Sequence, residues 1–194
     1  MTIPTQLPVR LVVIIASILW GIWEKRLAER NRGNVEGEEV KDHGSFFWIY
    51  ISVSVGMTIA ALFTFSNFGA LLNPILWELM GISIAVLGLW IRLSAMRTLS
   101  KHFTHRVTIL KDHVLIRDGL YRWIRHPSYL GQILVLLGLG CALSNGFALL
   151  AAPFLTIIAL LFRIAIEERV LLDHFGQKYK EYCDTTSRLL PGIW

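Results

Sequence analysis

Long apolar runs with almost no charge in them are the feature that most constrains how this chain can fold. Hydrophobic residues make up 54% of the 194 residues and charged residues only 17%, whereas a soluble domain carries about 25% charged residues. The apolar residues fall in continuous runs rather than along one face of each element, which indicates membrane spans instead of a buried soluble core. We therefore expect an all-α fold, a polytopic membrane helix bundle.

Five such runs are candidate transmembrane helices. They cover residues 9–23, 46–65, 75–96, 129–143 and 147–166. The first is short, and Arg10 at its start is expected to extend it by snorkelling. Only Ser144-Asn145-Gly146 separates the last two, and these are typical turn residues. The two runs are therefore predicted to form a helical hairpin.

The charged residues sort to one side of this five-helix arrangement. Seventeen of the nineteen Lys and Arg residues, and thirteen of the fourteen acids, fall in the connections 24–44 and 97–128 or in the tail from residue 163. The positive-inside rule makes that side cytoplasmic and places the N-terminus outside. The net charge of +5 then favours contact with anionic membrane lipids, not with nucleic acid. Arg92 lies within the third run, where snorkelling is expected and lining of a substrate route is the alternative.

Small residues in the third and fourth runs predict close helix contacts. Gly81, Ala85 and Gly88 are four and three residues apart, and Gly131 and Gly138 share a face of the following helix. Residues without bulky side chains let membrane helices approach closely. We expect these two helices to pack through these positions.

The segment YRWIRHPSYLGQ, residues 121–132, places a dense polar cluster at the start of an apolar helix. Pro127 suits the first turn of that helix, because its missing N–H would be unpaired there anyway. The backbone N–H groups of residues 128–130 are expected to be free at the positive end of the helix dipole, where they would hold a small anion. The alternative is an interfacial belt in which Trp, Tyr and Arg only hold the helix at headgroup depth.

The segment RIAIEERVLL, residues 163–172, ends the last run. Arg163 and Glu167 are four residues apart and share a helical face, while Glu168 points roughly 100° away. An ionisable residue that faces the inside of a membrane bundle is a candidate functional residue. The alternative is that Arg163 snorkels and that the helix end is exposed.

The loop between these segments contains His102, His105 and His113. Three histidines in one loop raise the possibility of a metal site, but no cysteine lies near and only Asp112 and Asp118 supply acids, which is a poor zinc ligand set. We predict no metal. A loop of this length in a compact protein nevertheless favours a binding role.

The run GLYRWIRHPSYLG at 119–131, the EER run at 167–169 and the tail FGQKYKEYCDTTSRLLPGIW at 175–194 together resemble the isoprenylcysteine carboxyl methyltransferases. The resemblance covers about residues 97–194 and is that of a compact, prokaryotic-type member. It implies an integral-membrane enzyme that uses S-adenosyl-L-methionine and releases S-adenosyl-L-homocysteine. Residues 97–194 would then be the cofactor-binding catalytic region and residues 1–96 an N-terminal three-helix membrane region.

The resemblance also implies site residues. Arg163 would position the carboxylate of a lipophilic, prenyl-cysteine-like acceptor. The residues that would line the cofactor are His113, Val114, Leu115, Ile116, Tyr121, His126, Pro127, Ser128, Tyr129 and Glu167. This chain has fewer spans than the larger eukaryotic members, so the natural acceptor and the oligomeric state stay open.

Two other enzyme classes and one non-enzymatic role compete with this interpretation. A phospholipid N-methyltransferase shares the RHP and EE elements, but its amine acceptor needs a base rather than a cation. A sterol-type reductase has a similar tail and would need a basic pocket for the 2′-phosphate of NADPH. A lipid-anchored scaffold with an aromatic belt would bind no cofactor at all.

Overall fold

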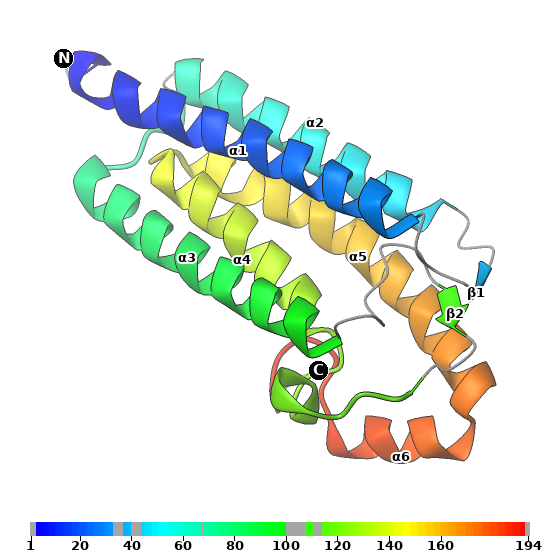
Figure 1. The fold of residues 1–194 in the computed structure, drawn as a ribbon. Helices are drawn as coiled ribbons and strands as arrows, with labels where there is room; N and C mark the ends of the chain where they lie inside the picture. Colours follow the sequence, from blue (N-terminus) through cyan, green and yellow to red (C-terminus); the bar gives the residue numbers. More distant parts are fainter. Residues whose placement is uncertain are drawn as a thin grey trace.

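The computed structural model describes residues 3–32, 37–39, 44–66, 68–99, 108–110 and 114–192. Within these residues, five long helices lie along one another in an elongated bundle: α1 (Ile3–Arg32), α2 (Ser45–Ser66), α3 (Pro74–Leu99), α4 (Pro127–Ala142) and α5 (Gly146–Phe175) (Figure 1). The 3-10 helix η2 (Gly119–Arg122) and helix α6 (Gln177–Thr185) lie at the end of the bundle opposite to the N-terminus. The predicted all-α class and its five helices are confirmed.

A small sheet at the end that carries α6 was not expected. Strand β1 (Gly37–Glu39) pairs antiparallel with β2 (Thr108–Leu110), with Gly37 opposite Leu110. Its two strands belong to the connection between α1 and α2 and to the connection between α3 and η2. Part of the charged segment 36–42, which looks like a plain solvated connector, is therefore hydrogen-bonded to a distant loop.

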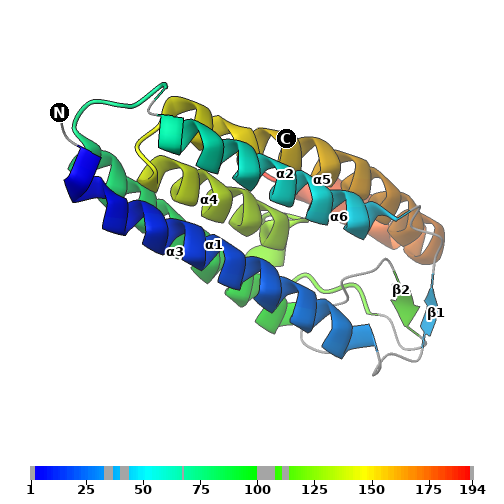
Figure 2. The ribbon, with the colours of Figure 1, turned by 90° about the horizontal axis from the view of Figure 1, so that it is seen from above.

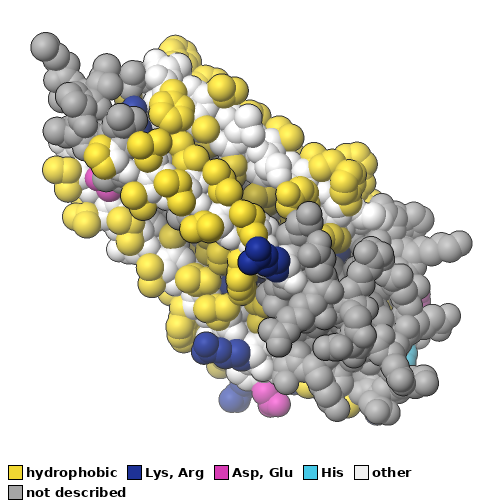
Figure 3. Space-filling view, turned by 45° about the horizontal axis from the view of Figure 1, so that its top comes forward, with side chains coloured by type: hydrophobic (Ala, Val, Ile, Leu, Met, Phe, Trp, Pro, Cys, Tyr) yellow, Lys and Arg dark blue, Asp and Glu magenta, His cyan; other side chains and the backbone are white. Residues whose placement is uncertain are grey.

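The outer surface of the bundle is apolar. Leu62, Ile75 and Phe154 are 66%, 71% and 64% exposed, and hydrophobic side chains cover most of the described surface seen in Figure 3. Such a surface is unfavourable in water but suits lipid tails. By length and composition α2, α3 and α5 are long and apolar enough to cross a membrane, whereas α4 and the apolar section 10–23 of α1 are shorter. The chain is a multi-pass membrane protein.

The helices pack in two close pairs, α3 on α4 and α2 on α5, and α4 also contacts α5 (Figure 2). Glycines make the first pair possible. A Cβ atom on Gly81 would lie 2.4 Å from the backbone nitrogen of Ala142, and one on Gly138 would lie 2.4 Å from that of Ala85. Further along, Cβ atoms on Gly88 and Gly131 would lie 2.6 and 2.7 Å from the backbone nitrogens of Val135 and Arg92. The predicted small-residue contact between these two helices is confirmed.

Asn145 fixes the turn between α4 and α5. Its side-chain oxygen accepts hydrogen bonds from the N–H groups of Phe147 and Ala148, at 3.0 and 3.1 Å, and so caps α5. Its amide nitrogen donates to the carbonyls of Phe63 and Phe68, at 3.3 and 2.7 Å. The predicted helical hairpin is confirmed, and this one side chain also attaches it to the end of α2.

The two arginines expected to snorkel are instead buried. Arg10 is 8% exposed, and one of its terminal nitrogens donates to the carbonyl of Thr64 at 3.1 Å. Arg92 is 4% exposed and donates to both the carbonyl and the hydroxyl oxygen of Ser128, at 3.1 and 3.0 Å. The snorkelling prediction is wrong for both, because each guanidinium finds an acceptor on a neighbouring helix or its end.

Replacing Gly138 by alanine should force α3 and α4 apart. The added methyl group has no room against the backbone of Ala85, and overpacking of this kind costs about 1–3 kcal/mol. We expect a clearly lower midpoint of thermal unfolding in detergent micelles.

The matched control is Gly21→Ala in α1, where an added Cβ meets nothing within 4 Å. The same chemical change should be neutral or slightly stabilising there, because alanine is the better helix former. Equal midpoints for the two variants would contradict the close packing of α3 on α4.

Candidate active site

The start of α4 organises one side of a polar cluster at the end of the bundle. Pro127 occupies its first turn, as predicted, directly after His126. The N–H groups of Tyr129 and Leu130 donate to the carbonyl of His126, at 3.1 and 3.2 Å. The prediction that the N–H groups of residues 128–130 are free is therefore wrong for these two, because the helix turn itself uses them. Any ligand here must be held mainly by side chains.

Arg163, Tyr129 and Glu167 form a hydrogen-bonded triad between α4 and α5. Arg163 donates from Nε to the hydroxyl oxygen of Tyr129 at 2.6 Å, and this hydroxyl donates to Oε2 of Glu167 at 2.7 Å. Arg163 is 3% exposed, whereas the side chain of Glu167 is 30% exposed. The triad thus places a buried cation and an accessible carboxylate on either side of one phenol.

His126 faces the same carboxylates. Its ring lies parallel to that of Tyr129, with centroids 5.5 Å apart and an interplanar angle of 7°. Its Nδ1 is 3.9 Å from Oε2 of Glu167, and its Nε2 is 3.4 Å from Oε1 of Glu168. The imidazole therefore lies between the two neighbouring acids of α5 and turns an aromatic face toward the triad.

Glu168 joins the C-terminal tail to the start of α4. It accepts from Nε of Arg125 through Oε1 and from Nε of Arg188 through Oε2, both at 2.9 Å. Its side chain is only 12% exposed and that of Arg125 only 9%. Ion pairs in such a partly dry environment are screened less than surface pairs, and removal of one partner is costly. Glu168 is therefore a structural link between three segments.

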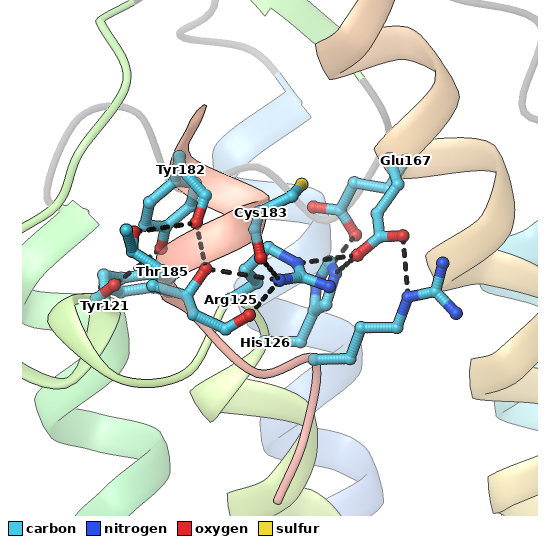
Figure 4. Close-up of polar contacts among 10 residues, drawn as sticks. Tyr121, Arg125, His126, Glu167, Tyr182, Cys183 and Thr185 are labelled. Atoms are coloured by element: carbon cyan, nitrogen blue, oxygen red, sulfur yellow. Dashed lines mark hydrogen bonds and ion pairs between the residues drawn. The ribbon is translucent and has the colours of Figure 1, made fainter. Parts of the chain in front are cut away.

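Arg125 also holds the end of α6. One of its terminal nitrogens donates to the carbonyl of Cys183 at 3.1 Å and to the hydroxyl and carbonyl of Thr186. Figure 4 shows its guanidinium between the carboxylates and the α6 segment that carries Tyr182 and Cys183. The backbone N–H of Arg125 donates to the carbonyl of Ser187 at 2.8 Å. The tail thus lies against the segment that precedes α4.

Two buried tyrosines close this end of the molecule. The hydroxyl of Tyr182 donates to the carbonyl of Tyr121 at 2.6 Å, and both residues are labelled in Figure 4. Burial raises the pKa of Tyr182 to about 12 and raises the pKa of Tyr121 well above its ordinary value, with nearby Glu167 adding to the shift. Both phenols are therefore neutral at physiological pH, and Tyr182 remains a hydrogen-bond donor.

The structure brings several of the residues predicted from the sequence together. His126, Tyr129, Arg163 and Glu167 contact one another. The carbonyl of Tyr121 accepts from the hydroxyl of Tyr182, and Pro127 and Ser128 are buried at the start of α4.

The segment ahead of η2 is joined to α6, because Arg117 donates from a terminal nitrogen to the carbonyl of Lys178 at 2.7 Å and its guanidinium lies over the ring of Tyr182. Val114 is 57% exposed and Leu115 and Ile116 are half-buried. His113, His102 and His105 lie outside the described residues. Among the described residues, no group of three or more His, Cys, Asp or Glu side chains is arranged to hold a metal ion.

Two residues of this cluster, Glu168 and Ser45, are not among those predicted from the sequence. Glu168 was separated from Glu167 by its direction on the helix, and its partners Arg125 and Arg188 lie 43 and 20 residues away. Ser45 accepts a hydrogen bond at 2.9 Å from a terminal nitrogen of Arg163, which is 118 residues distant. The sequence does contain an indication for Glu168, because a second acid beside Glu167 needs cations of its own. It contains no such indication for Ser45.

Comparisons with known proteins point to one family. The sequence model of the "Isoprenylcysteine carboxyl methyltransferase (ICMT) family" matches residues 79–173, which include the triad, His126 and Glu168. Over 118 residues the chain is 37% identical to a protein-S-isoprenylcysteine O-methyltransferase of Tribolium castaneum, covering 58% of this chain and 41% of that protein. Over 120 residues it is 37% identical to the protein of that name in Saccharomyces cerevisiae, covering 61% and 50%.

A solved structure is similar as well. It is that of a eukaryotic intramembrane Ras methyltransferase, an isoprenylcysteine carboxyl methyltransferase, with a TM-score of 0.58 and 29% sequence identity. The match covers 74% of this chain and 52% of that one. The chain thus spans about half the length of the relatives it matches.

Replacing Glu168 by glutamine should loosen the tail. The change keeps the shape but removes the charge that pairs with Arg125 and Arg188, at an expected cost of about 2–4 kcal/mol. Hydrogen exchange of the amides of residues 186–192 should become faster, and the midpoint of thermal unfolding should fall. Glu181→Gln on the exposed face of α6 is the control and should leave both unchanged. Unaltered tail exchange in the Glu168 variant would contradict the linking role.

Proposed function

Because this chain belongs to the isoprenylcysteine carboxyl methyltransferase family, we propose that it is an integral-membrane methyltransferase that uses S-adenosyl-L-methionine. Its acceptor is the carboxylate of an isoprenylated cysteine or a similar lipophilic acid. The observation that carries the proposal is the triad, in which a buried arginine and an accessible glutamate share the hydroxyl of Tyr129 at the end of an apolar bundle. Residues 97–194 form the cofactor-binding catalytic region and residues 1–96 the N-terminal membrane region.

The reaction asks for positioning more than for acid–base chemistry. A carboxylate is already ionised at neutral pH and needs no base to become a nucleophile. The protein must instead align it with the methyl group and keep water away from two oppositely charged reactants. A guanidinium suits this task because it binds a carboxylate through two parallel hydrogen bonds and does not give up its proton.

Arg163 is the residue that meets the acceptor carboxylate. Its guanidinium is buried, which strengthens its attraction for an anion, and it is held by Tyr129 and Ser45 on the two neighbouring helices. A side chain fixed in this way loses little conformational entropy when it binds. It lies level with the starts of α2 and α4, at the end of a bundle whose outer surface is apolar, so that a prenyl-like tail reaches it from the lipid.

The donor set of the site fits S-adenosyl-L-methionine. Glu167 offers a partly exposed carboxylate for the ammonium group or the ribose hydroxyls, and the rings of His126 and Tyr129 offer aromatic faces for a cation. When bound, the cofactor supplies a methyl group on a positively charged sulfur. His113, Val114, Leu115 and Ile116 are proposed to cover it, with Tyr121, Pro127 and Ser128 completing the lining.

The buried Arg163 also bears on the nearest rival, a phospholipid N-methyltransferase. An amine acceptor is protonated in water and must lose that proton before it attacks. A guanidinium fixed next to the acceptor would repel the protonated amine and offer no base. The contacts of Arg163 therefore favour an acid as the acceptor.

We also propose that the end of the bundle with α6 is cytoplasmic and that the N-terminus is outside. Seventeen of the nineteen basic residues lie in the stretches 24–44, 97–128 and 163–194, which gather toward that end, and such a bias sets membrane orientation. This arrangement gives the polar cofactor access from the cytosol. The bound partners are then a lipophilic acid, S-adenosyl-L-methionine and the surrounding lipids.

Replacing Arg163 by alanine should abolish most of the methyl-transfer activity without preventing the binding of the cofactor. With labelled S-adenosyl-L-methionine and farnesylcysteine, the wild-type protein should form a base-labile methyl ester. The Arg163→Ala variant should show kcat/KM for the acid lowered about 100-fold or more, whereas calorimetry should find cofactor binding largely kept. Arg169→Ala, at an exposed position of the same helix, is the control.

Two further assays, one with another acceptor and one with another cofactor, separate the rival functions. Transfer to phosphatidylethanolamine that survives loss of Arg163 would support the amine enzyme instead. Tight binding of NADPH without binding of S-adenosyl-L-methionine would support a reductase. Absence of binding by either cofactor would leave only a scaffold role.

The orientation is testable by labelling single cysteines. In a background with Cys141→Ala and Cys183→Ser, Leu72→Cys lies in the connection between α2 and α3, at a residue that is 86% exposed, and Lys180→Cys lies on α6. A membrane-impermeant maleimide should label the former in intact cells and the latter only after lysis. The reverse pattern would contradict the proposed orientation.

A further inference from the structure

Ser45 is placed by a sharp turn at the start of α2. Gly44 has a φ of +71°, a conformation that a residue with a side chain seldom adopts. Its carbonyl accepts from the N–H groups of Phe47 and Trp48, at 2.9 and 3.2 Å, so the helix begins immediately after it. Ser45, the first residue of α2, is completely buried, with 0% exposure.

The hydroxyl of Ser45 meets the arginine of the triad. Its oxygen accepts from a terminal nitrogen of Arg163 at 2.9 Å, while Nε of the same guanidinium donates to Tyr129 at 2.6 Å. The two acceptors lie on different helices, α2 and α4, on either side of α5. The guanidinium is therefore held at two of its nitrogens from two directions.

Two anchors have a geometric effect that one does not have. A guanidinium is planar, and its donors point in fixed directions within that plane. A single bond at Nε leaves the group free to pivot about that contact. A second bond at a terminal nitrogen fixes the plane, and with it the orientation in which the guanidinium meets an acceptor carboxylate.

We infer that Ser45 is a positioning residue for methyl transfer, acting through Arg163, and that α2 thereby contributes to the active site. The inference rests on the proposed function, since it assumes that Arg163 meets the acceptor. Ser45 lies outside residues 79–173, the segment matched by the family model. It also belongs to the region 1–96, which would otherwise serve only to anchor the protein in the membrane.

The test is a double-mutant cycle on kcat/KM with a radiolabelled methyl donor and farnesylcysteine. Ser45→Ala should lower kcat/KM for the acid about 10- to 100-fold in the wild-type background, since small misplacements cost that much. In the Arg163→Ala background the same change should cost nothing, because the group that it orients is gone. The dissociation constant of S-adenosyl-L-methionine should stay within about twofold.

Ser52→Ala is the matched control. Ser52 lies on the same helix, and its hydroxyl donates only to the carbonyl of Ile49 within that helix, at 2.8 Å; kcat/KM should not change. If Ser45→Ala cannot be purified in folded form, Ser45→Cys, which keeps the shape but weakens the acceptor, takes its place with the same expectation.

The outcomes separate the two ideas. An active wild-type protein with an unimpaired Ser45 variant overturns the inference alone. Equal losses in both backgrounds also overturn it, because they indicate a general structural role. A wild-type protein that binds cofactor but methylates no lipophilic acid overturns the proposed function, and the role of Ser45 with it.

Discussion

A guanidinium buried at the end of an apolar bundle is the constraint around which this site is built. Charge in such surroundings is tolerated only when hydrogen-bond partners replace the lost water. Arg163 finds them in Tyr129 and Ser45, and the hydroxyl of Tyr129 donates a hydrogen bond to Glu167. Satisfying one arginine therefore brings α2, α4 and α5 to a common point. The same contacts that make the burial tolerable also give the group a defined direction.

The C-terminal tail is also held by a nearly buried charge, in this case a negative one that is paired with cations. Glu168 is a nearly buried acid, and it is balanced by Arg125 and Arg188 from two other segments. Arg125 in turn satisfies carbonyls at the end of α6. The two neighbouring acids of α5 thus have separate tasks. Glu167 belongs to the triad and is partly exposed, whereas Glu168 keeps the enclosing segments in place.

Local sequence patterns were sufficient to predict the helices, the hairpin and the glycine contacts. Pro127 and Asn145 act on the first turns of their own helices. Gly81 and Gly138 each share a helical face with another glycine of the same helix, so each prediction depended on near neighbours in the sequence. The α4–α5 part of the site was predictable in the same way. Arg163 and Glu167 lie one helical turn apart, and the motif that contains Tyr129 is dense in polar residues.

The remaining contacts depend on which segments meet in the folded protein, and the spacing of residues along the sequence does not reveal this. Arg10 and Arg92 were expected at the membrane surface, yet both are buried, because Thr64 and Ser128 offer acceptors from other helices. The free N–H groups expected after Pro127 are consumed by the carbonyl of His126. Ser45 shows the limit most clearly, since nothing within its own segment indicates a partner 118 residues away.

The glycine contacts limit where a lipid-soluble molecule can enter the bundle from the membrane. Along the seam of α3 and α4, backbone meets backbone at Gly81 and Gly138, and Gly56 of α2 comes as close to Ala152 of α5. An alkyl chain is wider than the space that these contacts leave. Both seams are therefore closed to a lipid chain, and the lipophilic acid proposed as the substrate has to enter at another helix boundary.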